Sequence, residues 1–250
     1  MKSLDQLLHV LATKKAQLDE FRPLPDALVA NLTQWFTVEL TYTSNALEGN
    51  TLTRSETAAV VEKGLTIAGK PLRDHLEAIN YVHALNFVND LIDKQRSDIT
   101  ANTLLDIHRI ILKAIDDAHA GVWRTVAVRI AGSLLEPPAP LRVPDLMREF
   151  ISWLHAVNEQ PVLVAAQAHK RLVDIHPFVD GNGRTARLLM NVLLVQEGYP
   201  PAIIHVQDRV AYVQALARAD AGDPLDFYLL IAHAVEHSLD LYLAAARTST

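Results

Sequence analysis

A twelve-residue segment, His176 to Arg187, concentrates chemically active side chains in the last third of this chain. The apolar run 188–195 follows it, and Gly198 stands just beyond that run. This order predicts a buried helix that begins near Gly181–Gly183 and ends at Gly198. A helix start presents free backbone N–H groups and the positive end of the helix dipole, so it binds anions and phosphates in particular.

The side chains of this segment suit phosphate chemistry. Arg184 and Arg187 are three residues apart, so they share one face of a helix. A carboxylate beside a phosphate site is repelled unless a metal lies between them, which makes Asp180 a candidate ligand of Mg²⁺. His176 can accept a proton near neutral pH. The segment therefore predicts phosphoryl or nucleotidyl transfer.

Simpler interpretations exist for each part of the segment. A single histidine before a proline is typical of a loop, and Gly-Asn-Gly is typical of a turn. Gly181, Gly183 and Ala186 also fit a loose dinucleotide-binding pattern. The residues before them, Ile-His-Pro-Phe, do not form an apolar strand, and no βαβ pattern surrounds them, so we reject a Rossmann domain.

A second metal-binding pattern lies near the end of the chain. Residues 233–237 read His-Ala-Val-Glu-His, which matches the inverted zinc-protease motif H-x-x-E-H. Five-residue patterns arise often by chance in a chain with eleven histidines, and no distant third ligand stands out. A solvated face of the last helix is the favoured interpretation, and a zinc hydrolase is not.

Composition narrows the class of protein. A length of 250 residues suits one or two domains, and no apolar run reaches the roughly 18 residues of a membrane span. The N-terminus lacks the apolar core of a signal peptide, and there are no cysteines. A formal net charge of −6 argues against a general nucleic-acid binder. We therefore expect a cytoplasmic protein without membrane or nucleic-acid partners.

Apolar periodicity predicts a mainly helical chain. A capping-box pattern at residues 53–56 predicts the start of one helix, and Gly49 is placed to end the helix before it. Val126, Val128 and Ile130 alternate with other residues, and a turn signal follows at 132–133, which predicts a short β-hairpin. The histidines at 75, 83 and 108 are expected to be structural or solvated. The expected helices cover residues 4–20, 26–48, 54–64, 72–94, 101–116, 144–157, 161–175, the run after Gly183, 207–221 and 224–245.

The segment 176–187 resembles the signature of the Fic family, His-x-Phe-x-Asp/Glu-Gly-Asn-Gly-Arg-x-x-Arg, and all eight specified positions are present. The resemblance implies an all-α Fic fold, a helical bundle with a short β-hairpin flap over the active site. It implies N-terminal helices over residues 1–50 and one compact catalytic domain over 51–250. The implied activity is transfer of AMP from ATP to a Ser, Thr or Tyr hydroxyl of a target protein. Dimers are frequent in this family, so a homodimer is compatible with the resemblance.

The resemblance also assigns roles to individual residues. His176 takes the proton of the target hydroxyl, and Asp180 holds Mg²⁺ or Mn²⁺. The flap residues that hold the target segment correspond to Val128, Arg129 and Ile130. Asp220 departs from the family, whose close members usually carry asparagine at that position. The residues implied to contact the nucleotide are Gly181, Asn182, Gly183, Arg184, Arg187, Ala131, Gly132, Ser133, Leu134, Tyr212 and Asp220.

Glu48 stands in the last turn of a predicted helix, where the helix dipole disfavours a negative charge. It is either one exposed glutamate at a helix end or the partner of a cation, with the two arginines of the signature as candidates. Ser44-x-x-x-Glu48-Gly49 resembles the inhibitory motif of Fic proteins, which implies a Glu48–Arg187 pair that blocks productive ATP binding. Two alternatives stay open: a de-AMPylase in which Glu48 aligns a water, and a non-catalytic nucleotide-binding module.

Overall fold

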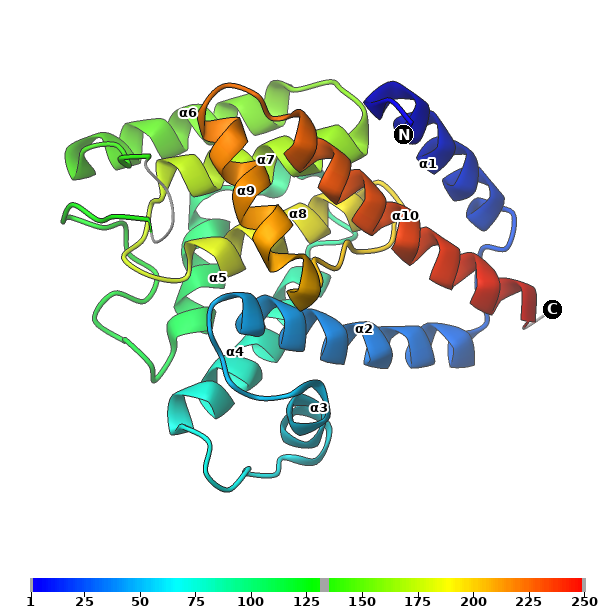
Figure 1. Ribbon diagram of the computed structural model, residues 1–250, viewed down its shortest axis with the longest axis horizontal. Helices are drawn as coiled ribbons and strands as arrows, with labels where there is room; N and C mark the ends of the chain where they lie inside the picture. Colours follow the sequence, from blue (N-terminus) through cyan, green and yellow to red (C-terminus); the bar gives the residue numbers. More distant parts are fainter. Residues whose placement is uncertain (1, 131–134, 249–250) are drawn as a thin grey trace.

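The computed structural model describes residues 2–130 and 135–248, and the chain within these ranges is helical without a strand. Figure 1 shows the helices joined by loops into a bundle. The predicted all-α class is confirmed. The α-helices are α1 Leu4–Asp19, α2 Asp26–Leu47, α3 Arg54–Lys63, α4 Leu72–Asn89, α5 Ala101–Leu112, α6 Val143–Ala156, α7 Pro161–Ile175, α8 Asn182–Gln196, α9 Arg209–Asp220 and α10 Leu225–Thr248, with 3₁₀ turns η1 Arg96–Asp98, η2 Pro140–Arg142 and η3 Val206–Asp208.

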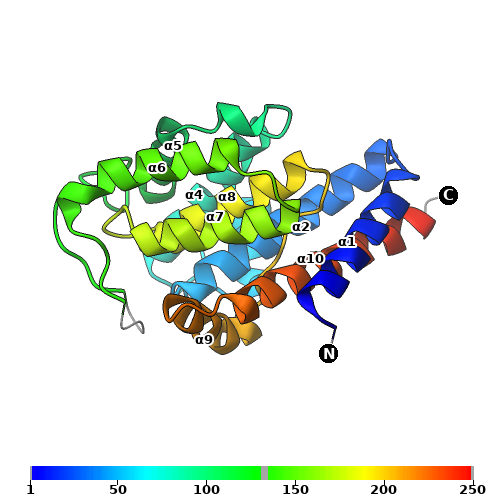
Figure 2. The same cartoon turned by 90° about the horizontal axis from the view of Figure 1, so that it is seen from above.

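Helix α8 is the element around which the others pack. Every residue from Arg184 to Leu194 is buried, as expected for a helix that is apolar on nearly all sides. Helix α7 runs alongside α8, which Figure 2 shows from above, and α5, α4 and α2 contact its other sides. The bundle therefore holds the start of α8, which carries the signature residues, in a fixed position.

Local capping signals set the ends of the helices. The Thr53 side chain accepts a hydrogen bond from the Glu56 amide, and the Glu56 carboxylate accepts one from the Thr53 amide, so the predicted capping box is present. Gly49, with φ +100°, follows the end of α2. A left-handed glycine at this place stops the helix, and Glu48 becomes its cap residue.

The N-terminal helix shares the core of the bundle. Leu7, Leu11 and Leu18 of α1 are fully buried and belong to the main hydrophobic cluster. Helix α1 lies along α10 in Figures 1 and 2, and Lys14 forms ion pairs with Glu236 and Asp240 of that helix. The division into residues 1–50 and 51–250 stays a prediction.

Two helices end earlier than the sequence predicts. Helix α4 stops at Asn89, and residues 91–94 continue only as turns. Helix α5 stops at Leu112 because Ala114 adopts a left-handed φ of 59°, and its amide donates to the Asp117 carboxylate at 2.7 Å. A side-chain acceptor that captures a backbone N–H competes with continued helix in this way.

The predicted β-hairpin is not present in the described part of the chain. Residues 126–130 form no strand, and the predicted turn falls within 131–134, outside the described residues. A strand needs backbone partners on a neighbouring strand. Here the carbonyls of Val126 and Pro138 accept hydrogen bonds from the Arg124 side chain instead, at 3.0 and 2.6 Å. An ion pair of 3.0 Å joins Arg129 and Glu136 across the segment.

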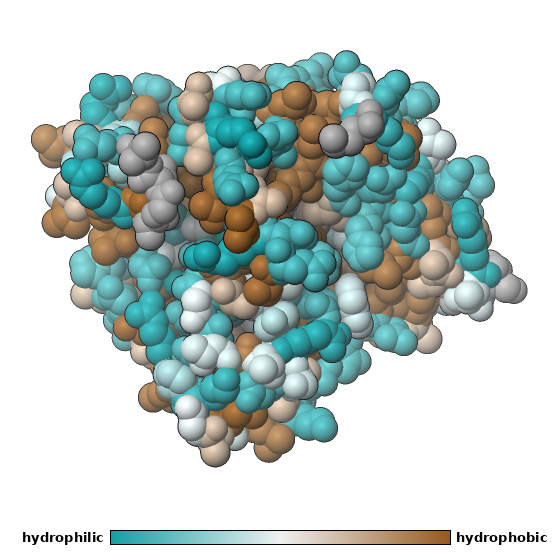
Figure 3. Space-filling view, viewed as in Figure 1, coloured by the Kyte–Doolittle hydropathy of each residue, from teal (hydrophilic) through white to brown (hydrophobic). Residues whose placement is uncertain are grey.

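The surface is largely hydrophilic, as expected for a chain whose apolar residues lie mainly in the core. Figure 3 shows hydrophilic side chains over much of one face, with smaller apolar patches between them. In residues 2–130 and 135–248, no helix combines the length and the apolar character needed to cross a bilayer.

Replacement of Leu11 by alanine tests the contribution of α1 to the core. The side chain is fully buried, so truncation should lower the free energy of unfolding by about 2–5 kcal/mol. The matched control is Leu141→Ala, because Leu141 is 92% exposed. Urea denaturation would measure both variants. Equal stability of the two would contradict the packing of α1 in the core.

Candidate active site

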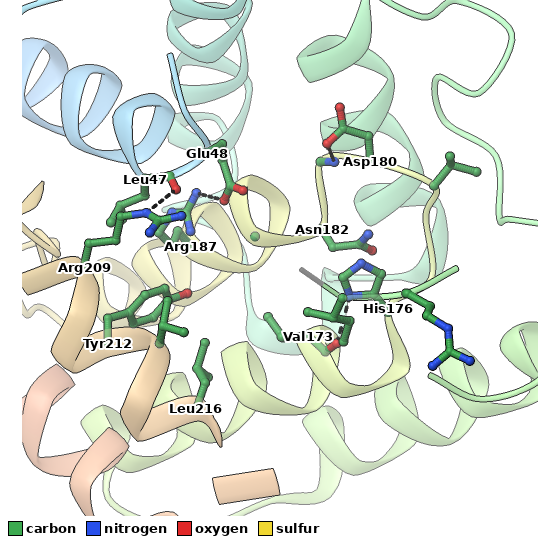
Figure 4. Close-up of a pocket in the computed structure, with 16 residues that line it drawn as sticks. Leu47, Glu48, Val173, His176, Asp180, Asn182, Arg187, Arg209, Tyr212 and Leu216 are labelled. Carbon is green, nitrogen blue, oxygen red and sulfur yellow. Dashed lines mark hydrogen bonds and ion pairs between the residues drawn. The ribbon is translucent and has the colours of Figure 1, made fainter. Parts of the chain in front are cut away.

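The ends of several helices surround a cavity of about 290 Å³. Figure 4 shows His176 on one side of it and the Glu48–Arg187 pair on the other. The walls of the cavity are formed by the start of α8, the end of α2, the end of α7, helix α9 and the segment after Arg124. Its lining comprises Leu47, Glu48, Arg129, Ile130, Val173, His176, Val179, Asp180, Gly181, Asn182, Gly183, Arg187, Arg209, Tyr212, Val213 and Leu216.

The backbone at the start of α8 depends on glycine. Gly181 caps the helix with φ +77°, a conformation that side chains disfavour. A Cβ atom there would also lie 3.2 Å from the His108 ring. At Gly183, a Cβ would collide with the Glu48 carboxylate and lie 3.0 Å from the Arg187 guanidinium. The predicted helix start is present, and its first turn faces the cavity.

Hydrogen bonds within the loop fix the residues that precede α8. The Asn182 side chain accepts from the Phe178 amide and donates to the Phe178 carbonyl, both at 2.9 Å. The Gly181 amide donates to the Asp180 carboxylate at 2.6 Å. The Asn182 side chain therefore fixes the conformation of the loop. The backbone of the first turn of α8 lies at the cavity.

His108 supports the loop from behind. Its ring stacks on Phe178 with 3.6 Å between ring centroids, and its Nδ1 accepts from the Gly121 amide at 3.0 Å. Nε2 must then donate to the Asp180 carbonyl, 2.9 Å away. Burial, followed by the nearby Arg184 charge, lowers the pKa of His108 to about 4. The expectation that this histidine is structural agrees with its position, because it lies outside the cavity lining.

His176 is placed to act as a base. It ends α7 in a left-handed conformation with φ 48°, which is uncommon for a residue with a side chain. Nδ1 lies 3.2 Å from the Val173 carbonyl and donates to it, so Nε2 is the nitrogen free to accept a proton. Burial lowers the pKa of His176 below its ordinary value of 6.5. The imidazole is therefore neutral at pH 7.

Glu48 pairs with Arg187, as the inhibitory motif implies. Arg187 Nη2 donates to Glu48 Oε1 at 2.6 Å and to the Ser44 carbonyl at 2.9 Å. Arg187 Nε donates to Ser44 Oγ at 2.9 Å. Burial alone would lower the pKa of Arg187, but the Glu48 carboxylate together with Tyr212 and Tyr81 outweighs burial and raises that pKa. Glu48 and Ser44 thus bind a buried cation at the end of α2, where a carboxylate without a partner would be unfavourable.

The other signature arginine lies apart from Arg187. The Arg184 side chain is 1% exposed and lies 3.2 Å from Glu77 and 3.4 Å from Asp180. It lies behind the loop and outside the cavity lining, although the resemblance implies contact with phosphates. Arg73 at the start of α4 binds the second oxygen of Asp180 at 2.8 Å. Arginines therefore surround the carboxylate, and together with the Gly181 amide they outweigh burial and lower the pKa of Asp180.

Asp180 suits a magnesium site completed by a substrate. Its side chain is 45% exposed and lines the cavity. In the described ranges, no group of three or more His, Cys, Asp or Glu side chains could hold a metal by itself. Mg²⁺ commonly uses one or two carboxylates together with substrate phosphates. The donor set fits Mg²⁺ or Mn²⁺ shared with a nucleotide, with Asp180 as the protein ligand.

The remaining predicted contacts divide into three groups. Tyr212, Arg129 and Ile130 line the cavity, whereas Val128 does not. Asp220 also lies outside the lining and forms an ion pair of 2.8 Å with Lys170. The predicted nucleotide contacts Ala131, Gly132, Ser133 and Leu134 lie outside the described residues.

The cavity also contains residues that the sequence reasoning missed. Arg209 Nε donates to the Leu47 carbonyl at 3.2 Å, which ties α9 to the end of α2 (Figure 4). Val213 and Leu216 form an apolar wall beside Tyr212. Arg209 precedes Tyr212 by three residues, so helical spacing from Tyr212 is a signal that would find it.

The H-x-x-E-H pattern does not form a metal site. His233 and His237 are exposed on α10. Glu236 forms ion pairs with Lys2 and Lys14, at 3.3 and 3.0 Å. The described parts of the chain contain no group of three or more His, Cys, Asp or Glu side chains that could hold a metal ion.

Acid should destabilise the fold through His108. The unfolded histidine has an ordinary pKa of 6.5, whereas the folded one has a pKa of about 4, so the unfolded chain binds the proton more readily. Stability is therefore lost as pH falls from 6.5 towards 4. Between pH 7.5 and 5 this group should account for about 2 kcal/mol of the free energy of unfolding. In urea denaturation at both pH values, His108→Gln should lose less stability on acidification than wild type. His83→Gln, at an exposed position, is the control and should behave as wild type.

Comparison with known proteins identifies the family. The description "Fic/DOC family" applies to residues 98–194, which include the whole signature. "Protein adenylyltransferase Fic" of Nematostella vectensis is 40% identical over 207 residues, covering 82% of this chain and 48% of the relative. The protein of that name from Drosophila melanogaster is 42% identical over the same length and is covered to 42%. The chain thus spans about half the length of these curated relatives.

Solved structures extend the similarity to the whole fold. Fic-1 from C. elegans superposes with a TM-score of 0.89 at 33% identity, over 99% of this chain and 74% of that one. A Fic domain containing signaling protein from Bacteroides thetaiotaomicron gives a TM-score of 0.86 at 28% identity, over 95% and 97%. With the signature residues gathered at one cavity and this similarity along nearly the full chain, the protein belongs to the Fic family.

Proposed function

We propose that this protein transfers AMP from ATP to a hydroxyl group of a target protein and that Glu48 inhibits the transfer. The observation that best supports this proposal is that His176, the start of α8 and Arg187 line a single cavity. A neutral base thereby faces an anion-binding helix end and a buried cation. The relatives named protein adenylyltransferase support the same activity.

The nucleotide would lie along the cavity from α9 to α8. Tyr212, Val213 and Leu216 offer an apolar wall for the adenine. The phosphates would lie at the first turn of α8, where backbone N–H groups and the helix dipole favour negative charge. Arg187 would neutralise phosphate charge once it is free of Glu48. Mg²⁺ or Mn²⁺ on Asp180, when bound, supplies further charge neutralisation at the phosphates.

The chemical step needs one base and one charge-stabilised leaving group. Nε2 of His176 takes the proton from the target hydroxyl. The hydroxyl oxygen forms a bond to the α-phosphorus of ATP, and the bond from that phosphorus to the bridging oxygen of the β-phosphate breaks. Pyrophosphate leaves with the electron pair. Positioning and charge neutralisation account for most of the acceleration in such phosphoryl transfers.

The target would lie beside residues 126–130 and 135–139, the described parts of the segment that we propose to act as the flap. Arg129 and Ile130 of this segment reach the cavity, close to His176. The described residues of this segment form no strand, so their backbone is available to pair with an incoming peptide. We expect such pairing to place a Ser, Thr or Tyr hydroxyl of the target at the base.

Glu48 also supports a second candidate function. Its side chain is 36% exposed and lines the cavity together with His176 and Asp180. A carboxylate in that place can align a water molecule for hydrolysis of an AMP-modified protein. This would make the protein a de-AMPylase, with the same residues binding AMP. A non-catalytic nucleotide-binding module is the outcome in which neither reaction occurs.

Replacement of His176 by alanine should abolish transfer. Loss of a general base costs about 10²- to 10⁴-fold in rate. ATP binding should persist, because the phosphate site at α8 and the wall on α9 remain. Transfer would be measured with α-³²P-labelled ATP and Mg²⁺, and binding by calorimetry. The control is His83→Ala at an exposed position of α4. Transfer at the control rate by the His176 variant would refute its assignment as the base.

Replacement of Glu48 by glycine should activate transfer. Removal of the carboxylate frees Arg187 for phosphate, and the rate should rise roughly 5- to 150-fold, the range of typical coupling energies. The double variant Glu48→Gly/His176→Ala should be inactive. Labelled protein would be counted in reactions with and without cell lysate. ATP binding without label in any reaction would exclude the transferase and leave the non-catalytic module. Release of AMP from a modified protein by wild type, lost in Glu48→Gly, would instead establish the de-AMPylase.

A further inference from the structure

Arg124 is a buried cation that the mechanism above does not use. Its side chain is 3% exposed, and no carboxylate forms an ion pair with it among the described residues. It also lies outside the lining of the cavity, so it is not placed to bind the nucleotide. Burial of a charge without a counter-ion is unfavourable unless several hydrogen bonds compensate for it.

Those hydrogen bonds join three separate parts of the chain. Nε donates to the His176 carbonyl at 2.7 Å, Nη1 to the Val126 carbonyl at 3.0 Å, and Nη2 to the Pro138 carbonyl at 2.6 Å. The backbone amide of Arg124 donates to the Pro177 carbonyl at 2.9 Å. One planar guanidinium therefore binds the catalytic loop and both arms of the segment 126–139.

The contact with Arg124 supports an unfavourable backbone conformation at His176. The residue has φ 48° and ψ 58°, a left-handed conformation that costs free energy for a residue other than glycine. Such a conformation persists only where its surroundings hold it. The carbonyl of His176 is held by Arg124, and its ring is held through Nδ1 by Val173.

We propose that Arg124 is a positioning residue that sets the orientation of His176 and the position of the flap together. This proposal rests on the proposed function, in which His176 is the base and the flap holds the target. A guanidinium carries its donors on three nitrogens of a rigid plane, so it can bind three carbonyls that lie on different sides of it, whereas the donors of a lysine all sit on one nitrogen. The target hydroxyl and its base are then placed by a single side chain. A target that shifts the flap also acts on the base through this contact.

The test compares Arg124→Gln and Arg124→Lys in the Glu48→Gly background, with Arg148→Gln as the control. Arg148 is an exposed arginine of α6 that pairs with Asp145. Glutamine removes the charge and most donors, whereas lysine keeps the charge but carries all its donors on one nitrogen and so cannot take the place of Nε, Nη1 and Nη2 together. Three quantities would be measured: the kcat and KM of transfer, hydrogen exchange of the segment 125–139, and the pKa of the His176 ring by NMR.

Both Arg124 variants should lower kcat by about 100-fold, the effect of an ångström-scale misplacement of a catalytic group, while KM for ATP is unchanged. Exchange of the flap amides should increase in both, with exchange in α8 unchanged. Burial and then the Arg124 charge lower the pKa of His176, so this pKa should rise in Arg124→Gln and stay low in Arg124→Lys. Arg148→Gln should change none of the three quantities.

A full transfer rate in Arg124→Lys would overturn the proposal, because charge alone would then suffice. Unchanged flap exchange in the two Arg124 variants would also overturn it. If the Glu48→Gly parent transfers no AMP, the proposed function fails, but exchange and the His176 pKa still decide whether Arg124 joins flap and base. If Arg124→Gln does not fold, Arg124→Lys and its exchange pattern give the answer.

Discussion

The burial of the Arg187 guanidinium is the constraint on which the functional site depends. A buried cation needs an anion or a set of hydrogen-bond acceptors, and the end of α2 provides both through Glu48 and Ser44. The contact requires α2 to end beside the first turn of α8, with glycine at position 183 so that the carboxylate can approach. In the proposed function, the anion site and its inhibitor are therefore two parts of one arrangement, because a phosphate and Glu48 would compete for the same cation.

The two arginines of the signature have different surroundings despite their equivalent spacing. Arg187 faces the cavity, whereas Arg184 is surrounded by Glu77, Asp180 and the packed helices. Arg184 thus fixes the carboxylate that suits a metal, and His108 fixes the carbonyl of the same residue. Contacts behind the loop hold Asp180 from two sides. The position of Asp180 at the surface of the cavity is therefore set by side chains that lie outside the cavity.

Much of this site follows from local sequence signals. The turn at Gly181, the left-handed Gly49 and the capping box at Thr53 each depend on residues within one helical turn, so the sequence predicts these three helix ends. The Glu77–Arg184 contact and the bonds of Arg124 join segments far apart in the chain, and no local pattern indicates them. The hairpin at 126–130 was predicted from alternation, which reports side-chain pattern but not the identity of the backbone partners. The backbone carbonyl of Val126 accepts a hydrogen bond from the Arg124 guanidinium and not from a neighbouring strand.

Helix α2 contributes Phe36, Leu40 and Leu47 to the main core, so it cannot leave the bundle without exposing apolar surface. Only the Glu48 side chain, at the solvent-accessible end, is free to move away from Arg187. Exposed side chains change rotamer within picoseconds to nanoseconds, whereas a helix separates from a core in microseconds to seconds. In the proposed function, the extent of inhibition would then depend on the fraction of time that the Glu48 carboxylate spends in contact with Arg187.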